Sequence, residues 1–363
     1  MNNIINGICR WGLPALLLVS GACACDEWTE TESLKQEYAT VQDQNPGLWN
    51  AYLQSLRNYR QSDHKILVAG FDNNPGVPSG RGELLGALPD STDFAVLSNP
   101  DNLTDAVVAD MGTIKEEKGI KTLYTVSYEN MLASYDAYLA AWKAEHPDPE
   151  SGGETAGADE PSGDAVPAEE ALTRSEFIAG ELADSLALYD KYGYDGIVVS
   201  FTGTSTLKLS DEEKNAERLL QDEFFIPLKE WKSSRADAVL MFSGKPRNLL
   251  SEDFLSLCDY IVIPAETASS AYELSFRVRS SMDSGIPSDR FIACVSAPYG
   301  KLGMFSGNVT AIEGAADWAV SEDGTYSRAG IMVMHAQKDY FNSVAYGNIR
   351  RAISIMNPTP KFQ

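Results

Sequence analysis

The sequence predicts an α/β protein with a (β/α)8, or TIM, barrel, and three observations lead to this fold class. Eight short segments are apolar almost throughout, which is typical of strands buried on both faces of a parallel sheet. Helical patterns separate most of these segments. The eight units span about 280 residues, which suits one barrel of this kind. The predicted strands are residues 65–71, 93–98, 121–127, 196–201, 238–243, 260–265, 291–297 and 330–336.

The helices predicted between these strands follow from the spacing of apolar residues. In the last of them, Leu274 and Val278 share one face. An open doubly wound sheet is the alternative fold, but residues 70–82, GFDNNPGVPSGRG, lack the glycine spacing of a phosphate-binding loop after a first strand. The predicted helices include residues 103–118, 129–143, 174–191, 211–234 and 270–283.

One segment breaks this alternation. Residues 144–170 contain nine Asp or Glu and no Lys or Arg, and they are rich in Pro, Gly, Ala and Ser. This composition predicts a solvated, disordered insertion rather than a domain. A domain boundary is the rival interpretation, and we reject it because the flanking helices belong to one β/α unit. We therefore expect a single barrel domain over residues 60–363.

The N-terminal segment resembles the signal of a bacterial lipoprotein. Residues 11–24, WGLPALLLVSGACA, form an apolar run that is too short to span a bilayer and ends in small residues. Cys25 and the acids after it complete the pattern, so residues 1–24 would be a signal peptide and Cys25 the lipidated residue. Residues 25–59 would form a lipidated tether and an N-terminal helix. Lipidation at Cys23 and an ordinary secretory signal with incidental cysteines are the alternatives.

Composition narrows the partners that the chain can have. The 363 residues are 44% hydrophobic and carry a formal net charge of −23, which argues against binding nucleic acid or anionic membrane surfaces. Membrane attachment is expected through the lipid anchor only. Cys258 and Cys294 lie in apolar segments and are expected to be small core residues, with a disulfide between them left open. His335 has no second His or Cys nearby, so the sequence predicts no metal site and no cofactor.

The fourth predicted strand carries the main functional signal. Residues 192–202 read YGYDGIVVSFT, which is a helix end, an Asp195-Gly196 turn and an apolar strand. This segment resembles the signature strand of glycoside hydrolase family 18, the chitinases and endo-β-N-acetylglucosaminidases, whose motif is D-G-x-D-x-D-x-E. Together with the lipoprotein start and the segments 330–342, GIMVMHAQKDYFN, and 345–358, AYGNIRRAISIMNP, it resembles the Bacteroidetes branch of that family over residues 60–357.

The resemblance implies substrate-assisted chemistry, in which the final Glu of the motif protonates the glycosidic oxygen and the preceding Asp orients the acetamido group. In this chain the three acidic positions after Asp195 fall on Val198, Ser200 and Thr202, which would share one face of the strand. An alcohol cannot replace a general acid near neutral pH. We therefore expect a non-catalytic lipoprotein on the outer surface of the outer membrane, a pseudoenzyme that captures N-acetylglucosamine-containing or related oligosaccharides beside a glycan importer complex.

Aromatic and polar residues at the predicted strand ends are the candidates for contacting the sugar, because barrel proteins build their sites there. Aromatic rings can pack against pyranose C–H groups, while carboxylates and amides bind hydroxyls. The candidate carbohydrate-binding residues are Phe71, Asp72, Asn99, Tyr128, Ser200, Thr202, Glu266, Tyr299, Gln337 and Tyr340.

Two other functions stay open. An active endo-β-N-acetylglucosaminidase or chitinase-like hydrolase could use displaced acids, for which Asp72, Glu129 and Glu266 are the candidates. A retaining pair would need two carboxyls about 5–5.5 Å apart across the cleft. The third function is that of a structural partner of the importer, with the mouth of the barrel filled by side chains.

Overall fold

The computed structural model describes residues 41–73, 78, 80–146, 170–251 and 253–358. The chain divides into a unit of residues 1–50 and a unit of residues 51–363. Of the first unit, the structure describes α1 (Val41–Gln44) and the start of α2 (Pro46–Gln61). The lipidation site and residues 147–169 of the predicted insertion lie outside the described residues.

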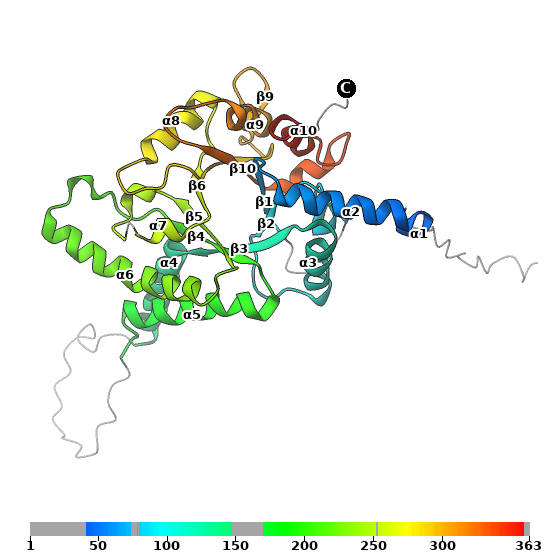
Figure 1. The fold of residues 1–363 in the computed structure, drawn as a ribbon. Coiled ribbons are helices and arrows are strands. Elements are labelled where there is room, and N and C mark those ends of the chain that lie inside the picture. The colour runs from blue at the N-terminus through cyan, green and yellow to red at the C-terminus, as the bar shows by residue number, and fades with distance from the viewer. Residues whose placement is uncertain (1–40, 74–77, 79, 147–169, 252, 359–363) are drawn as a thin grey trace, which may run out of the picture. The chain divides into compact units, whose positions relative to one another are not determined.

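The second unit is a closed barrel of eight parallel strands, as the sequence predicts (Figure 1). Seven strands pair in chain order, and the eighth closes the barrel on the first, with Val68 opposite Met332. The strands are β1 (Ile66–Phe71), β2 (Phe94–Leu97), β3 (Lys121–Ser127), β4 (Gly196–Phe201), β5 (Val239–Gly244), β6 (Tyr260–Pro264), β7 (Phe291–Ser296) and β10 (Arg328–Met334).

Helices surround the strands (Figure 1). Thr173 and Glu176 form a capping box at the start of α5, and Gly193 ends that helix in the left-handed conformation with φ of 70°. A short hairpin of β8 (Met304–Phe305) and β9 (Val309–Thr310), which the sequence analysis missed, precedes α9. The helices around the barrel are α3 (Asp105–Lys118), α4 (Tyr128–Glu145), α5 (Arg174–Tyr192), α6 (Asp211–Ser233), α7 (Asp253–Leu257), α8 (Ala271–Ser281), α9 (Ala311–Val320) and α10 (Gly347–Met356).

The strands bury both of their faces in two separate apolar clusters. One cluster fills the inside of the barrel and includes Val68, Leu123, Val198 and Met332. The larger cluster lies between the barrel and the helices and contains the alternate residues of each strand, among them Phe71. This alternation of period two decides which side chains at the strand ends can face inward.

The two cysteines in the described residues belong to different clusters. Cys258 is buried in the outer cluster and Cys294 inside the barrel, and both are free thiols. The disulfide that the sequence left open is therefore not formed. No helix in the described part of the chain is long and apolar enough to cross a bilayer.

The Asp195-Gly196 turn, part of the family 18 resemblance, has a structural role at the start of β4. A Cβ on Gly196 would lie 2.1 Å from the carbonyl oxygen of Val239 on β5, so only glycine fits there. The carboxylate of Asp195 accepts a hydrogen bond from the Thr122 N–H at 2.9 Å and pairs with Lys115 Nζ at 2.6 Å. Both residues therefore hold the N-terminal end of the barrel together.

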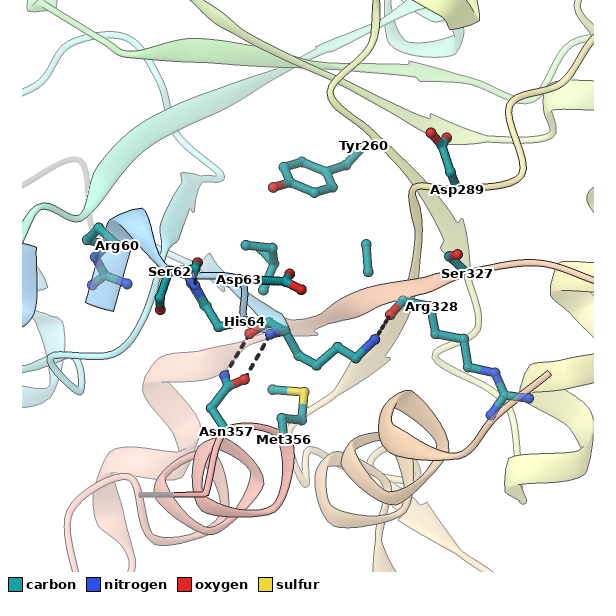
Figure 2. Close-up of a pocket in the computed structure, with 13 residues that line it drawn as sticks. Arg60, Ser62, Asp63, His64, Tyr260, Asp289, Ser327, Arg328, Met356 and Asn357 are labelled. Atoms are coloured by element: carbon teal, nitrogen blue, oxygen red, sulfur yellow. Dashed lines mark hydrogen bonds between the residues drawn. The ribbon is translucent and has the colours of Figure 1, made fainter. Parts of the chain in front are cut away.

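A polar cavity of about 650 Å³ lies at the N-terminal ends of the strands (Figure 2). Lys65 is one of the residues that line it, and the side chain of Asn357 hydrogen-bonds the backbone N–H and C=O of Lys65, each at 2.8 Å. Lys65 Nζ donates to the carbonyl of Arg328 at 2.7 Å. These contacts tie the C-terminal end of α10 to β1 and β10.

Asp93, just before β2, organises the charged groups beside this cavity. Its carboxylate accepts hydrogen bonds from Arg60 Nη1 at 2.6 Å, His64 Nε2 at 2.9 Å and the Leu67 N–H at 2.9 Å. The other ring nitrogen of His64 contacts the carbonyl of Ser62 at 2.7 Å. Because these side chains already have partners, and because this face of a (β/α)8 barrel generally serves stability, we assign the cavity a structural role.

Candidate functional site

The candidate site is the mouth of the barrel, by which we mean the C-terminal ends of its strands and the loops that follow them. The end of β4 has the orientation that the sequence predicts. Val198 packs inside the barrel and is 1% exposed, so alternation places Ser200 and Thr202 on the same inward face. Ser200 is half-buried and Thr202 is exposed. None of these three positions carries a carboxylate.

Hydroxyl side chains take up the inward positions of the neighbouring strands as well. Ser127 on β3, Ser200 on β4 and Ser243 on β5 lie directly opposite one another in register. We call these three residues the hydroxyl row. One layer deeper, Thr125 pairs with Val198 and its side chain is exposed, so solvent enters the barrel to this depth. The mouth on this side is open and lined by small polar groups.

Two side chains from neighbouring strand ends hold the backbone of Thr202. Glu129, the second residue of α4, accepts the N–H of Thr202 at 2.5 Å and that of Gly203 at 3.0 Å, both on Oε1. On the other side, Asn248 Nδ2 donates to the carbonyl of Thr202 at 2.7 Å. The end of β4 is therefore fixed by contacts from the segments after β3 and β5.

Asp72, after β1, lies at the centre of a second polar cluster. His335 Nδ1 and Gln337 Nε2 each lie 2.6 Å from its Oδ2, and the hydroxyl of Ser98 donates to Oδ1 at 3.0 Å. Burial raises the pKa of the Asp72 carboxyl, but the hydrogen bonds from these neighbours outweigh it and hold the pKa below its ordinary value. Asp72 is thus an ionised carboxylate that already has several hydrogen-bond donors.

Glu266, after β6, contacts the thiol of Cys294 on β7. The Sγ atom lies 3.4 Å from Oε1 of Glu266. Burial raises the pKa of the Cys294 thiol well above its usual value, so the thiol keeps its proton and is the donor. Glu266 is half-buried.

Two of the residues predicted to contact the sugar point away from the mouth. Phe71 is fully buried in the cluster behind the barrel wall, and alternation with the inward Asp72 requires this. Tyr128 is also buried: its ring packs on Phe201 and Phe224, and Arg174 Nη2 donates to its hydroxyl at 2.6 Å. The prediction that these two rings serve as sugar platforms was wrong, because neither offers an exposed face.

The other predicted residues do lie at the rim. Tyr299 is 52% exposed, with the ring of His335 at 5.0 Å and Lys338 Nζ at 5.3 Å from its centroid. Asn99 is exposed and forms reciprocal hydrogen bonds with Asn73. Gln337 is buried against Asp72, and Tyr340 is half-buried. Of the predicted residues, all but Phe71 and Tyr128 therefore remain candidates at the mouth, with Gln337 acting through Asp72.

One exposed aromatic residue at the rim was missed. Phe341, after β10, is 77% exposed. Its ring edge lies close to Gly82, where a Cβ would be 3.1 Å from the ring tip, so the segments after β1 and β10 meet here. Asp339 fixes this segment because its buried carboxylate accepts the Ile349 N–H at 2.9 Å. The signal was present in the sequence, since Phe341 directly follows the predicted candidate Tyr340.

Comparisons with known proteins agree with this architecture. The selenomethionine form of a BT1044 variant is 18% identical, with a TM-score of 0.59 over 88% of this chain and 96% of that one. An endo-β-N-acetylglucosaminidase from Cordyceps militaris is 16% identical, with a TM-score of 0.55 over 85% and 96%. A mutant of that enzyme in complex with fucosyl-N-acetylglucosamine-Asn gives 16% and 0.53 over the same shares. At these identities the likeness shows the fold.

No curated protein sequence matches the chain. The family profile described as glycoside hydrolase family 18, BT1044-like, matches residues 29–355 and so covers the whole barrel. The chain belongs to glycoside hydrolase family 18, in its BT1044-like group.

Proposed function

We propose that this protein binds a glycan in the mouth of its barrel without cleaving it. One observation carries the proposal: Val198 and Ser200 on the inward face of β4, and Thr202 directly after the strand, stand where the family motif has carboxylates. Substrate-assisted hydrolysis needs a proton donor at the glycosidic oxygen and a carboxylate at the acetamido group. Hydroxyl groups can hydrogen-bond a sugar at these positions, but they cannot do that chemistry.

The proposed ligand is an oligosaccharide that contains N-acetylglucosamine. The structure with fucosyl-N-acetylglucosamine-Asn is that of a relative in fold, and it supports this class only by similarity. The hydroxyl row supplies donors and acceptors on one side of the mouth, and Tyr299 supplies an exposed ring on the other. Polar groups that fix orientation beside an aromatic surface are typical of sites for small polar ligands.

We also propose where the protein works. The lipoprotein-like start places a lipid anchor on Cys25, and the acids after it favour export to the outer surface of the outer membrane. A protein held there could pass captured oligosaccharides to an outer-membrane importer. The support for this part is the sequence of residues 11–32 alone.

A hydrolase with displaced acids is the second candidate function. The observation that favours it is Glu129, because its carboxylate lies beside Thr202, at the position of the motif's final Glu. Asp72 is less suited to a proton-transfer role, because three side chains already donate to its carboxylate. Glu266 has one such donor among the residues that the structure describes, the thiol of Cys294.

A glycan array probed with the purified protein tests the proposal first, and each bound glycan is then incubated with the protein and analysed by mass spectrometry. We expect binding to at least one N-acetylglucosamine-containing glycan and no change in its mass. Shorter products would favour the displaced-acid hydrolase, and an empty array would favour a structural partner of the importer.

A further inference from the structure

Glu129 brings a carboxylate to the end of β4 although it does not belong to that strand. It follows β3, where Leu123 faces the inside of the barrel and Val126 faces the helices. Tyr128 packs outward against Phe201 and Phe224, so the side chain of Glu129 turns back toward the mouth. There it meets the backbone of Thr202, 73 positions later in the chain.

This carboxylate is held in a fixed position. Oε1 accepts two backbone N–H groups, from Thr202 at 2.5 Å and from Gly203 at 3.0 Å. Gly203 has φ of 54°, and a Cβ there would lie 2.3 Å from the ring of Phe201, so the turn that aims its N–H at Glu129 requires glycine. Asn248 fixes the same turn from the other side through the carbonyl of Thr202. The donors therefore do not need to move when the carboxylate takes up a ligand.

The second oxygen, Oε2, has no such partner. Among the described residues, none hydrogen-bonds it, and the side chain of Glu129 is half-buried rather than enclosed. Oε2 is therefore a partly exposed oxygen of a carboxylate whose other oxygen is fixed on a rigid turn. Such an oxygen is a preorganised acceptor, and preorganisation lowers the entropic cost of binding.

We propose that Glu129 is a binding residue of the glycan site, with Oε2 accepting a hydrogen bond from a sugar hydroxyl or acetamido N–H. This inference rests on the proposed function. It names the protein group that would recognise the hydrogen-bond donors of the glycan. The two N–H groups on Oε1 complement the negative charge of a carboxylate that accepts hydrogen bonds. A protonated carboxyl group, which a proton donor requires, would lack that charge. Glu129 thus supplies a carboxylate at the end of β4 for recognition, not for proton transfer.

The variant Glu129→Gln distinguishes the roles of the two carboxylate oxygens. The amide keeps an oxygen to accept from Thr202 and Gly203, but it replaces the ligand-facing acceptor by an NH2 donor. We expect this variant to unfold at the urea concentration of the wild type and to bind N-acetylchitotetraose about tenfold to a hundredfold more weakly by calorimetry, the range of hydrogen bonds to charged groups. Glu145→Gln, at the exposed far end of α4, makes the same change of charge and should bind as the wild type.

Glu129→Asp is measured in parallel, because it keeps the charge but shortens the side chain, and it should also bind more weakly. If the wild type binds and both Glu129→Gln and Glu129→Asp bind equally well, this inference is overturned. The proposed function would then stay intact. No binding by the wild type to N-acetylchitotetraose or to an N-glycan would overturn the proposed function and this inference with it. Cleavage by the wild type that Glu129→Gln abolishes would overturn both and assign Glu129 to catalysis.

Discussion

Replacement of Asp93 by Asn should destabilise the barrel strongly, because Asp93 is a buried charge with charged partners. Its side chain is 5% exposed and that of Arg60 is 15% exposed, with 2.6 Å between Oδ1 and Nη1. Removing one partner of a buried pair costs about 3–5 kcal/mol. We expect about 3 kcal/mol, because Arg60 keeps hydrogen bonds to the carbonyls of Asp90 and Thr92. For a domain of about 300 residues this corresponds to about 5 °C in melting temperature.

The assay is urea unfolding at neutral pH, followed by circular dichroism, with Asp253→Asn as the matched control. Asp253 pairs with Lys229 at 2.8 Å, but its side chain is 73% exposed. Exposed pairs contribute about 0–1 kcal/mol, so the control should lose little. Equal losses in the two variants, or a loss below about 1 kcal/mol for Asp93→Asn, would refute the argument that burial of this network stabilises the N-terminal end of the barrel.

Three other predictions concern the anchor, the outward aromatic cluster and pH. The hydrogen bond to the buried aspartate raises the pKa of His64, so its stabilising effect is full below about pH 6.5 and is lost as pH rises through the folded pKa. The free energy of unfolding in urea, measured against pH, should therefore fall above that pH more for the wild type than for His64→Gln. Parallel pH curves for the two proteins would contradict this. Tyr128→Phe loses the hydrogen bond from Arg174 and should cost about 1 kcal/mol in unfolding free energy, with glycan affinity unchanged in calorimetry. Cys25→Ala should abolish labelling with palmitate. If labelling is lost in Cys23→Ala instead, Cys23 is the lipidated residue.

The barrel could be predicted because its signals are local. A strand buried on both faces needs apolar residues at every position, and the predicted strand 196–201 coincides with β4. Caps such as Thr173 and Gly193 likewise mark helix ends within a few residues. These features depend on neighbours in sequence, so a single sequence suffices to find them.

The site could be predicted only in part, because it depends on which way side chains turn. Phe71 and Asp72 are adjacent, so alternation allows only one of them to face the mouth, and this was overlooked. Tyr128 follows a strand end as a sugar platform would, but it begins a helix and turns into the outer cluster. The contact between Glu129 and Thr202 joins two separate strand ends and leaves no pattern in the sequence.

The most direct test of the account is calorimetry of the purified protein with N-acetylchitotetraose and with an N-glycan, followed by mass spectrometry of the same mixtures after long incubation. The account predicts that at least one of these glycans binds, that its mass stays unchanged, and that Tyr299→Ala weakens the binding because the exposed ring is lost. Shorter products from the wild-type protein, or the absence of binding to both glycans, would contradict a mouth that binds a glycan without cleaving it.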